Sequence, residues 1–127
     1  MSHTANILAM HPEMHTLFPN CPKRWNWLEN DGAVETTIAA REDEVDILLS
    51  ASIEKLDKTV LAQFPNLRMI ASISAGFSNI DLDECRSRGI AVTNAPGMNS
   101  GDVADLAVAM LSSLLLRIPQ SHAYIMN

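Results

Sequence analysis

The sequence lacks a cluster of basic residues. Lys and Arg together number 9 against 15 Asp and Glu, which gives a formal net charge of −6 at pH 7. Binding to nucleic acid or to an anionic membrane surface depends on Lys and Arg gathered on one face. The composition therefore argues against both kinds of partner. It leaves small anions open, because backbone amides hold an anion without any basic side chain.

Cysteine is scarce as well. Cys21 and Cys85 lie far apart and form no C-x-x-C pair. A disulfide-stabilised scaffold needs more cysteine than this, so we expect two reduced thiols. Residues 1–9 show no basic stretch followed by an apolar core, which a secretory signal requires. We therefore expect a cytoplasmic protein.

Two motifs for cofactor and metal binding are absent. No spacing among the glycines matches the dinucleotide-binding turn G-x-G-x-x-G; they are Gly32, Gly76, Gly89, Gly97 and Gly101. His11 and His15 lie close together, but they do not form H-E-x-x-H, and Pro12 argues against a helix. We interpret residues 11–15 as a solvated loop and expect no metal site.

Short apolar runs alternate with longer amphipathic ones along the chain. Strands are predicted at residues 6–10, 34–39, 45–49, 69–74 and 90–94. Helices are predicted at residues 25–30 (one or two turns), 53–64, 81–89 and 102–118. This alternation indicates a parallel sheet with helices on both faces. The predicted fold class is α/β, a flavodoxin-like doubly wound parallel sheet of about five strands.

The last predicted helix is apolar almost all round. From Leu106 to Leu116 only Ser112 and Ser113 interrupt the apolar residues, and the run is shorter than the roughly 20 residues that span a bilayer. Such a helix must be buried on several sides, and the sheet covers only one of them. We therefore expect a further domain or a homo-oligomer partner to pack on residues 103–118.

The segment Ser74–Asp81 lies where a strand ends and a helix begins. This edge is where open α/β sheets bind ligands. Gly76 allows successive N–H groups to face outward and form a nest for a carboxylate. The alternative is a plain turn in which glycine relieves backbone strain.

A second turn follows the last predicted strand. Pro96-Gly97 turns the chain, and a loop then enters a helix whose first residues include Asp102 and Asp105. Carboxylates stabilise the positive end of a helix, so helix capping is their simplest role.

Together the two segments resemble the D-isomer-specific 2-hydroxyacid dehydrogenases, most closely the glyoxylate/hydroxypyruvate and hydroxyphenylpyruvate reductase branch. The resemblance rests on G-F-x-N-I-D, R-G-I-x-V-x-N-x-P and V-A-D-L-A, and is dense over residues 67–119. It implies that the amides of Ala75 and Gly76 bind the substrate carboxylate. Ser100 is expected near the cofactor, and Asn99 and Asp102 in the hinge. Gly97 departs from the Asp that related reductases often carry.

The resemblance implies an NAD(P)-dependent oxidoreductase that reduces small 2-oxo acids, such as glyoxylate or hydroxypyruvate, to D-2-hydroxy acids. Residues 1–99 would form the N-terminal part of the substrate domain, residues 100–119 the hinge and interdomain helix, and residues 120–127 a tail. The Rossmann domain, with NAD or NADP, and the catalytic Arg, Glu and His are expected beyond Asn127. This chain alone is therefore expected to be inactive.

The alternative is a non-catalytic flavodoxin-like interaction module, or a truncated partner of a full-length dehydrogenase. Its best-known form, a phosphorylated receiver domain, needs an Asp after the third strand and acids after the first. Ser50 and Met10-His11 stand in those places, so that form is excluded.

Overall fold

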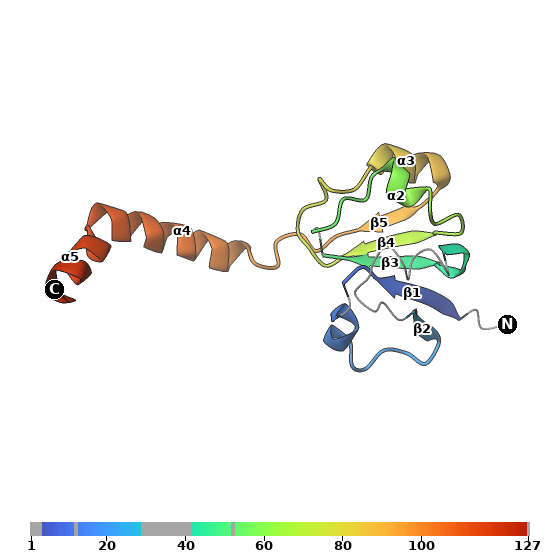
Figure 1. Cartoon of the computed structure of the whole chain (residues 1–127), viewed down its shortest axis with the longest axis horizontal. Coiled ribbons are helices and arrows are strands. Elements are labelled where there is room, and N and C mark those ends of the chain that lie inside the picture. Colours follow the sequence, from blue (N-terminus) through green and yellow to red (C-terminus); the bar gives the residue numbers. More distant parts are fainter. Residues whose placement is uncertain (1–3, 12, 29–41, 52, 127) are drawn as a thin grey trace. The chain divides into compact units, whose positions relative to one another are not determined.

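The computed structural model describes residues 4–11, 13–28, 42–51 and 53–126. The chain divides into two compact units, Met1–Pro96 and Gly97–Asn127, which are described separately below. The first unit contains one sheet with the strand order β2-β1-β3-β4-β5, in which every pair is parallel (Figure 1). Its strands are β1 (Ala5–Ala9), β2 (Trp25–Leu28), β3 (Ile47–Ser50), β4 (Met69–Ser72) and β5 (Ala91–Thr93). This is the flavodoxin-like order, so the predicted fold class is confirmed.

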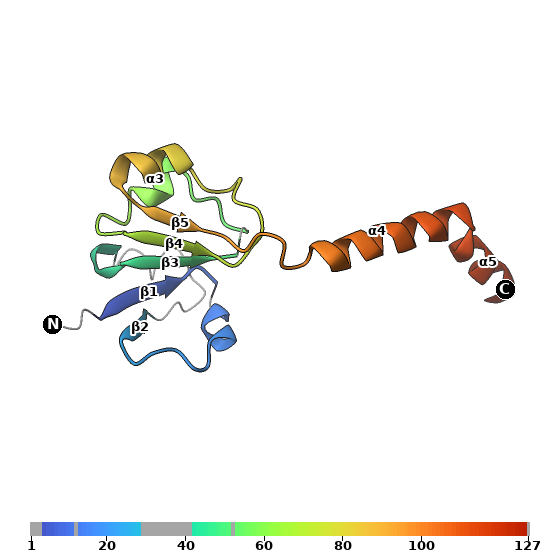
Figure 2. The ribbon, with the colours of Figure 1, turned by 180° about the vertical axis from the view of Figure 1, so that it is seen from behind.

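Short helical segments connect these strands (Figure 2). Among the described residues of the first unit they are the 3-10 turns η1 (Met14–Leu17) and η2 (Glu42–Glu44), and the helices α2 (Lys58–Leu61) and α3 (Leu82–Arg88). The second unit contains two helices, α4 (Ser100–Leu115) and α5 (Ile118–Met126).

The sheet carries a separate apolar cluster on each face. The larger cluster joins Leu48 and Ile70 of the sheet to Leu61 of α2 and Cys85 of α3, and all four side chains are buried. The second cluster lies on alternate strand residues, including Ile7, and on the η1 segment. Because successive side chains of a strand point to opposite faces, this alternation gives the two-sided burial expected of a parallel sheet.

The helix predicted at residues 25–30 is wrong, because residues 25–28 form β2. Ala5 lies opposite Trp25 and Leu8 opposite Leu28 in a parallel ladder. Pairing with β1 gives the backbone groups of this segment partners that local sequence preference could not reveal. The strand predicted at residues 34–39 lies outside the described residues.

The helix predicted at residues 53–64 is much shorter in the structure. Leu56 instead forms a parallel bridge with Ile80, donating to the Asn79 carbonyl and accepting from the Asp81 amide. The Asp57 carboxylate then accepts from the Thr59 and Val60 amides and starts α2. The Val60 amide and the Lys55 ammonium lower the pKa of the Asp57 carboxyl.

The predicted limits of α3 are confirmed. The Asp81 carboxylate accepts from the Glu84 amide at 2.9 Å, and Gly89 ends the helix in the left-handed conformation, with φ 70°. Only half of a capping box forms, because the Asp81 amide donates to Leu56 rather than to Glu84. The Glu84 carboxylate lies 3.5 Å from the Lys58 ammonium instead.

The single helix predicted at residues 102–118 is wrong at its end. α4 stops at Leu115, and Arg117 turns the chain with a positive φ of 53°. Pro119 then lies in the first turn of α5, where its missing N–H costs no helical hydrogen bond. Residues 120–126, predicted as part of a tail, continue this helix. No helix among the described residues is both long and apolar enough to cross a bilayer.

Gly89→Ala should destabilise the first unit, because an L-residue in the left-handed conformation costs roughly 1–2 kcal/mol. A Cβ at this position would meet no atom within 4 Å, so the cost is conformational rather than steric. Urea unfolding measures the change, and Gly89→Asn should lose less because Asn tolerates this conformation. Equal free energies of unfolding for Gly89→Ala and the wild type would contradict the left-handed conformation of Gly89.

Candidate functional site

The candidate site lies where β3, β4 and β5 end. In a parallel sheet the carboxyl ends of all strands meet at one edge, and ligands bind in the crevice outside that edge. Here β3 ends at Ser50, β4 at Ser72 and β5 at Thr93. The predicted carboxylate-binding residues Ala75 and Gly76 lie in the β4–α3 loop, residues 73–81, at this edge.

Serine side chains connect the β4–α3 loop to its neighbours. The Ser74 amide donates to Ser72 Oγ at 3.2 Å, and Ser74 Oγ donates to the Ala51 carbonyl at 2.7 Å. The first bond tightens the turn after β4, and the second ties that turn to the segment after β3. The start of the loop is therefore held on the β3 side by neutral hydroxyl groups.

Two further bonds hold the same loop on the β5 side. The Ala95 amide donates to the Ser74 carbonyl at 3.0 Å, and Asn94 Nδ2 donates to the Ala75 carbonyl at 2.7 Å. Both donors follow directly after β5. Two successive carbonyls of the loop are thus held by the end of β5.

These two bonds fix the direction of two amides. In a trans peptide the C=O and the following N–H point in opposite directions, and the described residues contain no cis peptide. Because the Ser74 and Ala75 carbonyls face the end of β5, the N–H groups of Ala75 and Gly76 point away from it. A pair of N–H groups held in this way can hydrogen-bond to a carboxylate.

The backbone conformation at position 76 does not require a glycine. Positive φ values occur among the described glycines only at Gly89 and Gly97. A Cβ built on Gly76 would meet no atom of the described residues within 4 Å. The alternative that glycine here relieves backbone strain is therefore not supported. The positive φ of Gly97, 77°, explains why glycine suits that turn.

The far end of the loop is braced by Asn79. Its Nδ2 donates to the Glu54 carbonyl at 2.8 Å, and its own carbonyl accepts from Leu56. The Glu54 carboxylate accepts from Ser50 Oγ at 3.3 Å. Asn79 Oδ1 is buried and has no protein hydrogen-bond partner among the described residues.

The other predicted site residues lie in the second unit. Asn99 occupies the N-cap position of α4 without a side-chain capping bond, Ser100 is the first residue of that helix and Asp102 lies in its first turn. All three are exposed. Their roles as hinge residues and as the group beside the cofactor stay predictions.

Groups that could perform other chemistry are few at this edge. His11 and Glu13 are exposed and line an open hollow of about 280 Å³ with Ala51 and Ile53. No group of three potential metal ligands occurs among the described residues. Both cysteines are free thiols, and burial, followed by the Asp81 carboxylate, raises the pKa of Cys85, which disfavours a nucleophilic thiolate.

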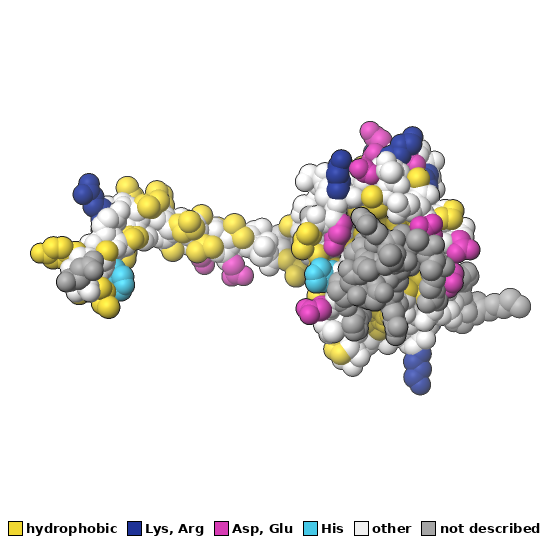
Figure 3. All heavy atoms as spheres, viewed as in Figure 1, with side chains coloured by type: hydrophobic (Ala, Val, Ile, Leu, Met, Phe, Trp, Pro, Cys, Tyr) yellow, Lys and Arg dark blue, Asp and Glu magenta, His cyan; other side chains and the backbone are white. Residues whose placement is uncertain are grey.

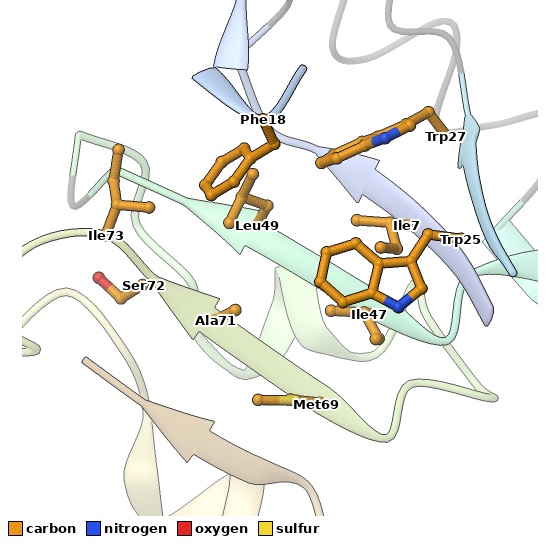
Figure 4. A pocket seen from close by; sticks show the side chains of 10 residues that line it. All are labelled: Ile7, Phe18, Trp25, Trp27, Ile47, Leu49, Met69, Ala71, Ser72 and Ile73. Atoms are coloured by element: carbon orange, nitrogen blue, oxygen red, sulfur yellow. The ribbon is translucent and has the colours of Figure 1, made fainter. Parts of the chain in front are cut away.

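A second hollow of about 290 Å³ lies on the sheet face that carries the smaller cluster (Figure 4). Trp25 and Phe18 border it, and the Phe18 and Trp27 rings stack with centroids 6.2 Å apart. Its lining residues are Ile7, Phe18, Trp25, Trp27, Ile47, Leu49, Met69, Ala71, Ser72 and Ile73. No titratable side chain is among them, so this surface suits apolar packing rather than catalysis.

Sequence reasoning identified Ala75 and Gly76 but missed Ser74 and Asn94, which hold them. The available signal was a polar residue close to the end of each strand, Ser74 two residues after β4 and Asn94 directly after β5. What these side chains bond to depends on the pairing of β3, β4 and β5, which no local pattern reveals.

The fold is that of an α/β domain with a parallel sheet, a class in which ligands bind outside the carboxyl ends of the strands. Residues 7–121 match the family described as D-isomer specific 2-hydroxyacid dehydrogenase, catalytic domain. Glyoxylate reductase of Thermococcus litoralis is 35% identical over 99 residues, 78% of this chain and 30% of that protein. Glyoxylate/hydroxypyruvate reductase A of Arabidopsis thaliana is 30% identical over 121 residues, 94% of this chain and 39% of that protein.

Solved structures agree with these matches. The NADPH-dependent glyoxylate/hydroxypyruvate reductase from Sinorhizobium meliloti, in complex with NADP and malonate, aligns with a TM-score of 0.72 and 25% identity. That alignment covers 92% of this chain and 37% of the reductase. The chain belongs to the D-isomer specific 2-hydroxyacid dehydrogenase family. The relatives named above are oxidoreductases that act on CH–OH groups. It spans between 30% and 39% of the length of the two curated relatives named above.

Proposed function

We propose that this chain supplies the carboxylate-binding part of a dehydrogenase that reduces small 2-oxo acids to D-2-hydroxy acids with NADH or NADPH. The observation that carries the proposal is the pair of peptide groups at Ser74–Gly76. Their carbonyls are tied to Asn94 and Ala95, which directs the N–H groups of Ala75 and Gly76 to the opposite side. Glyoxylate and hydroxypyruvate are the substrate class that the names of the relatives suggest.

Gly76 places no side chain beside these amides. A carboxylate must approach within about 3 Å of an N–H group to form a hydrogen bond. Within the described part of the chain no atom lies within 4 Å of a Cβ at Gly76, which is compatible with that approach. Ala75 and Gly76 would hold and orient the carboxylate, which places the neighbouring 2-oxo carbon at the sheet edge.

The family resemblance implies that the residues that would complete the reaction lie in sequence beyond Asn127. Reduction of a ketone needs a hydride donor and a proton donor near neutral pKa. The family Arg, Glu and His would provide substrate charge pairing and proton transfer there. Within this chain Ser100 would lie beside the cofactor, and Asn99 and Asp102 would form part of a hinge.

A dinucleotide does not fit the residues present. Its pyrophosphate is normally held by a glycine-rich turn between a strand and a helix N-terminus. The sequence has no G-x-G-x-x-G, and the described part of the second unit consists of α4, α5 and the turns beside them. NAD or NADP would therefore be held by a separate Rossmann domain.

Two apolar surfaces of this chain are suited to packing against a Rossmann domain, a second subunit or the rest of the substrate domain. Side chains of α4 are largely exposed, among them Leu106, Leu111 and Leu115 (Figure 3). A Rossmann domain, or a second subunit bound through residues 103–118, would cover them. The hollow bordered by Trp25 and Phe18 would receive the strand and helix that complete the substrate domain.

Gly76→Val should weaken substrate binding with little change in stability. In a full-length enzyme carrying this chain, the added side chain would crowd the carboxylate and cost about 1.5–3 kcal/mol, roughly a tenfold to hundredfold rise in the Michaelis constant for glyoxylate. The melting temperature should stay near the wild-type value, because a Cβ at Gly76 has open space around it. Cofactor affinity should barely change.

Gly76→Ala is the graded control for that variant and should give a smaller rise in the Michaelis constant. A folded Gly76→Val enzyme with the wild-type Michaelis constant would mean that the carboxylate is held elsewhere. A lowered melting temperature with unchanged substrate binding would instead make Gly76 a purely structural residue.

The chain by itself should show neither dehydrogenase activity nor strong nucleotide binding. The reason is the missing phosphate-binding turn together with the missing acid–base residues. Calorimetric titration with NADH and NADPH measures this. Binding with a low micromolar dissociation constant would contradict the assignment of the cofactor to another domain.

The isolated chain should associate with itself through α4. Leaving a large aliphatic side chain in water costs about 1.5–3 kcal/mol relative to burial. Leu111 is 58% exposed and Leu115 75% exposed, and Leu111→Lys with Leu115→Lys should reduce the association. Light scattering compares the two proteins. A wild-type chain that stays monomeric and melts in one cooperative transition would argue against an uncovered helix.

A further inference from the structure

A single side chain controls one of the two amides of the candidate site. We propose that Asn94 is a positioning residue, whose side-chain amide fixes the Ala75–Gly76 peptide so that the Gly76 N–H faces the substrate carboxylate. This inference rests on the proposed function and adds to it the residue that sets the orientation of the site. Asn94 itself need not touch the substrate.

The contact that carries this inference joins two segments far apart in the sequence. Asn94 Nδ2 donates to the Ala75 carbonyl at 2.7 Å, across 19 residues of chain. The Ala75 carbonyl and the Gly76 N–H belong to the same trans peptide and point in opposite directions. Rotating this peptide would move both groups together. Holding the carbonyl at Asn94 therefore holds the direction of the N–H.

The backbone next to Ala95 cannot replace this bond. The Ala95 amide already donates to the Ser74 carbonyl at 3.0 Å. The next residue is Pro96, which has no N–H to donate. The side chain of Asn94 thus supplies a hydrogen bond that the backbone of residues 95 and 96 does not provide.

The neutral charge of Asn94 also matters for an anion site. Among the described residues, the side chains that bond to the backbone of residues 74 and 75 are those of Ser72 and Asn94, and neither carries a charge. An Asp at position 94 would keep the shape of Asn, lose the donor and place a negative charge beside a carbonyl oxygen. Such a change should turn the peptide and repel a carboxylate.

The chain offers a matched control for loss of this bond. Asn66 Nδ2 donates to the Asp43 carbonyl, also at 2.7 Å and also in an exposed contact between distant segments. Asn66 lies before β4, at the opposite edge of the sheet from the β4–α3 loop. Asn66→Leu therefore removes an equivalent hydrogen bond without touching the site.

The experiment follows the backbone amides of the full chain by ¹⁵N NMR, first without ligand and then during titration with glyoxylate. Compared with the wild type and Asn66→Leu, the variants Asn94→Leu and Asn94→Asp should show increased motion at the Ala75 and Gly76 amides. Glyoxylate should shift these two amides in the wild type and in Asn66→Leu. Its affinity should fall about fivefold or more in Asn94→Leu, and further in Asn94→Asp.

The outcomes separate this inference from the function on which it rests. Asn94→Leu with wild-type amide motion and wild-type glyoxylate affinity would overturn the positioning role and leave the carboxylate site intact. A wild-type chain whose Ala75 and Gly76 amides do not respond to glyoxylate, while other amides do, would overturn the carboxylate site itself. Equal losses of glyoxylate affinity in Asn94→Leu and Asn66→Leu would mean that Asn94 contributes only to the stability of the fold.

Discussion

The parallel pairing of β4 with β5 sets Ala71 opposite Thr93 and thereby brings the ends of both strands to one level. From this register Ala95 reaches the Ser74 carbonyl and Asn94 reaches the Ala75 carbonyl. The direction of the two N–H groups follows from these two bonds and from peptide planarity. A slip of one residue in this pairing would reverse the faces of the side chains of β5 and separate the donors from their carbonyls.

The sequence predicted the elements whose ends are marked by local chemistry. α3 begins at Asp81 and ends at Gly89 because an N-cap carboxylate and a left-handed glycine act within a few residues. The predictions from the sequence failed where contacts between distant residues determine the secondary structure. Residues 25–28 form a strand because β1 supplies their hydrogen-bond partners, and Leu56 leaves its predicted helix because Ile80 pairs with it. Local preference is weak beside such pairings.

The same division applies to the candidate site. Gly76 could be selected from the sequence because a glycine after a buried strand is a local signal for a ligand-binding turn. Asn94 and Ser74 could not, because their roles are defined by acceptors at Ala75 and Ala51, which other segments supply. The structure also removed a competing explanation. Gly76 has no positive φ, and no atom of the described residues would crowd a Cβ there, so the described structure gives no conformational reason for a glycine.

The proposed site, made of backbone amides, would reconcile anion binding with an acidic chain. The formal net charge is −6, and no basic side chain bonds to residues 74 or 75 among the hydrogen bonds described for them. Amides fixed by neutral Ser and Asn side chains give direction to an anion, yet they attract it less strongly than a guanidinium does. In the proposed enzyme, selectivity for carboxylate geometry would therefore reside in this unit, and most of the charge attraction would come from another part of the active site. This division of roles fits a domain that orients its substrate and leaves the charge change of the reaction to groups outside it.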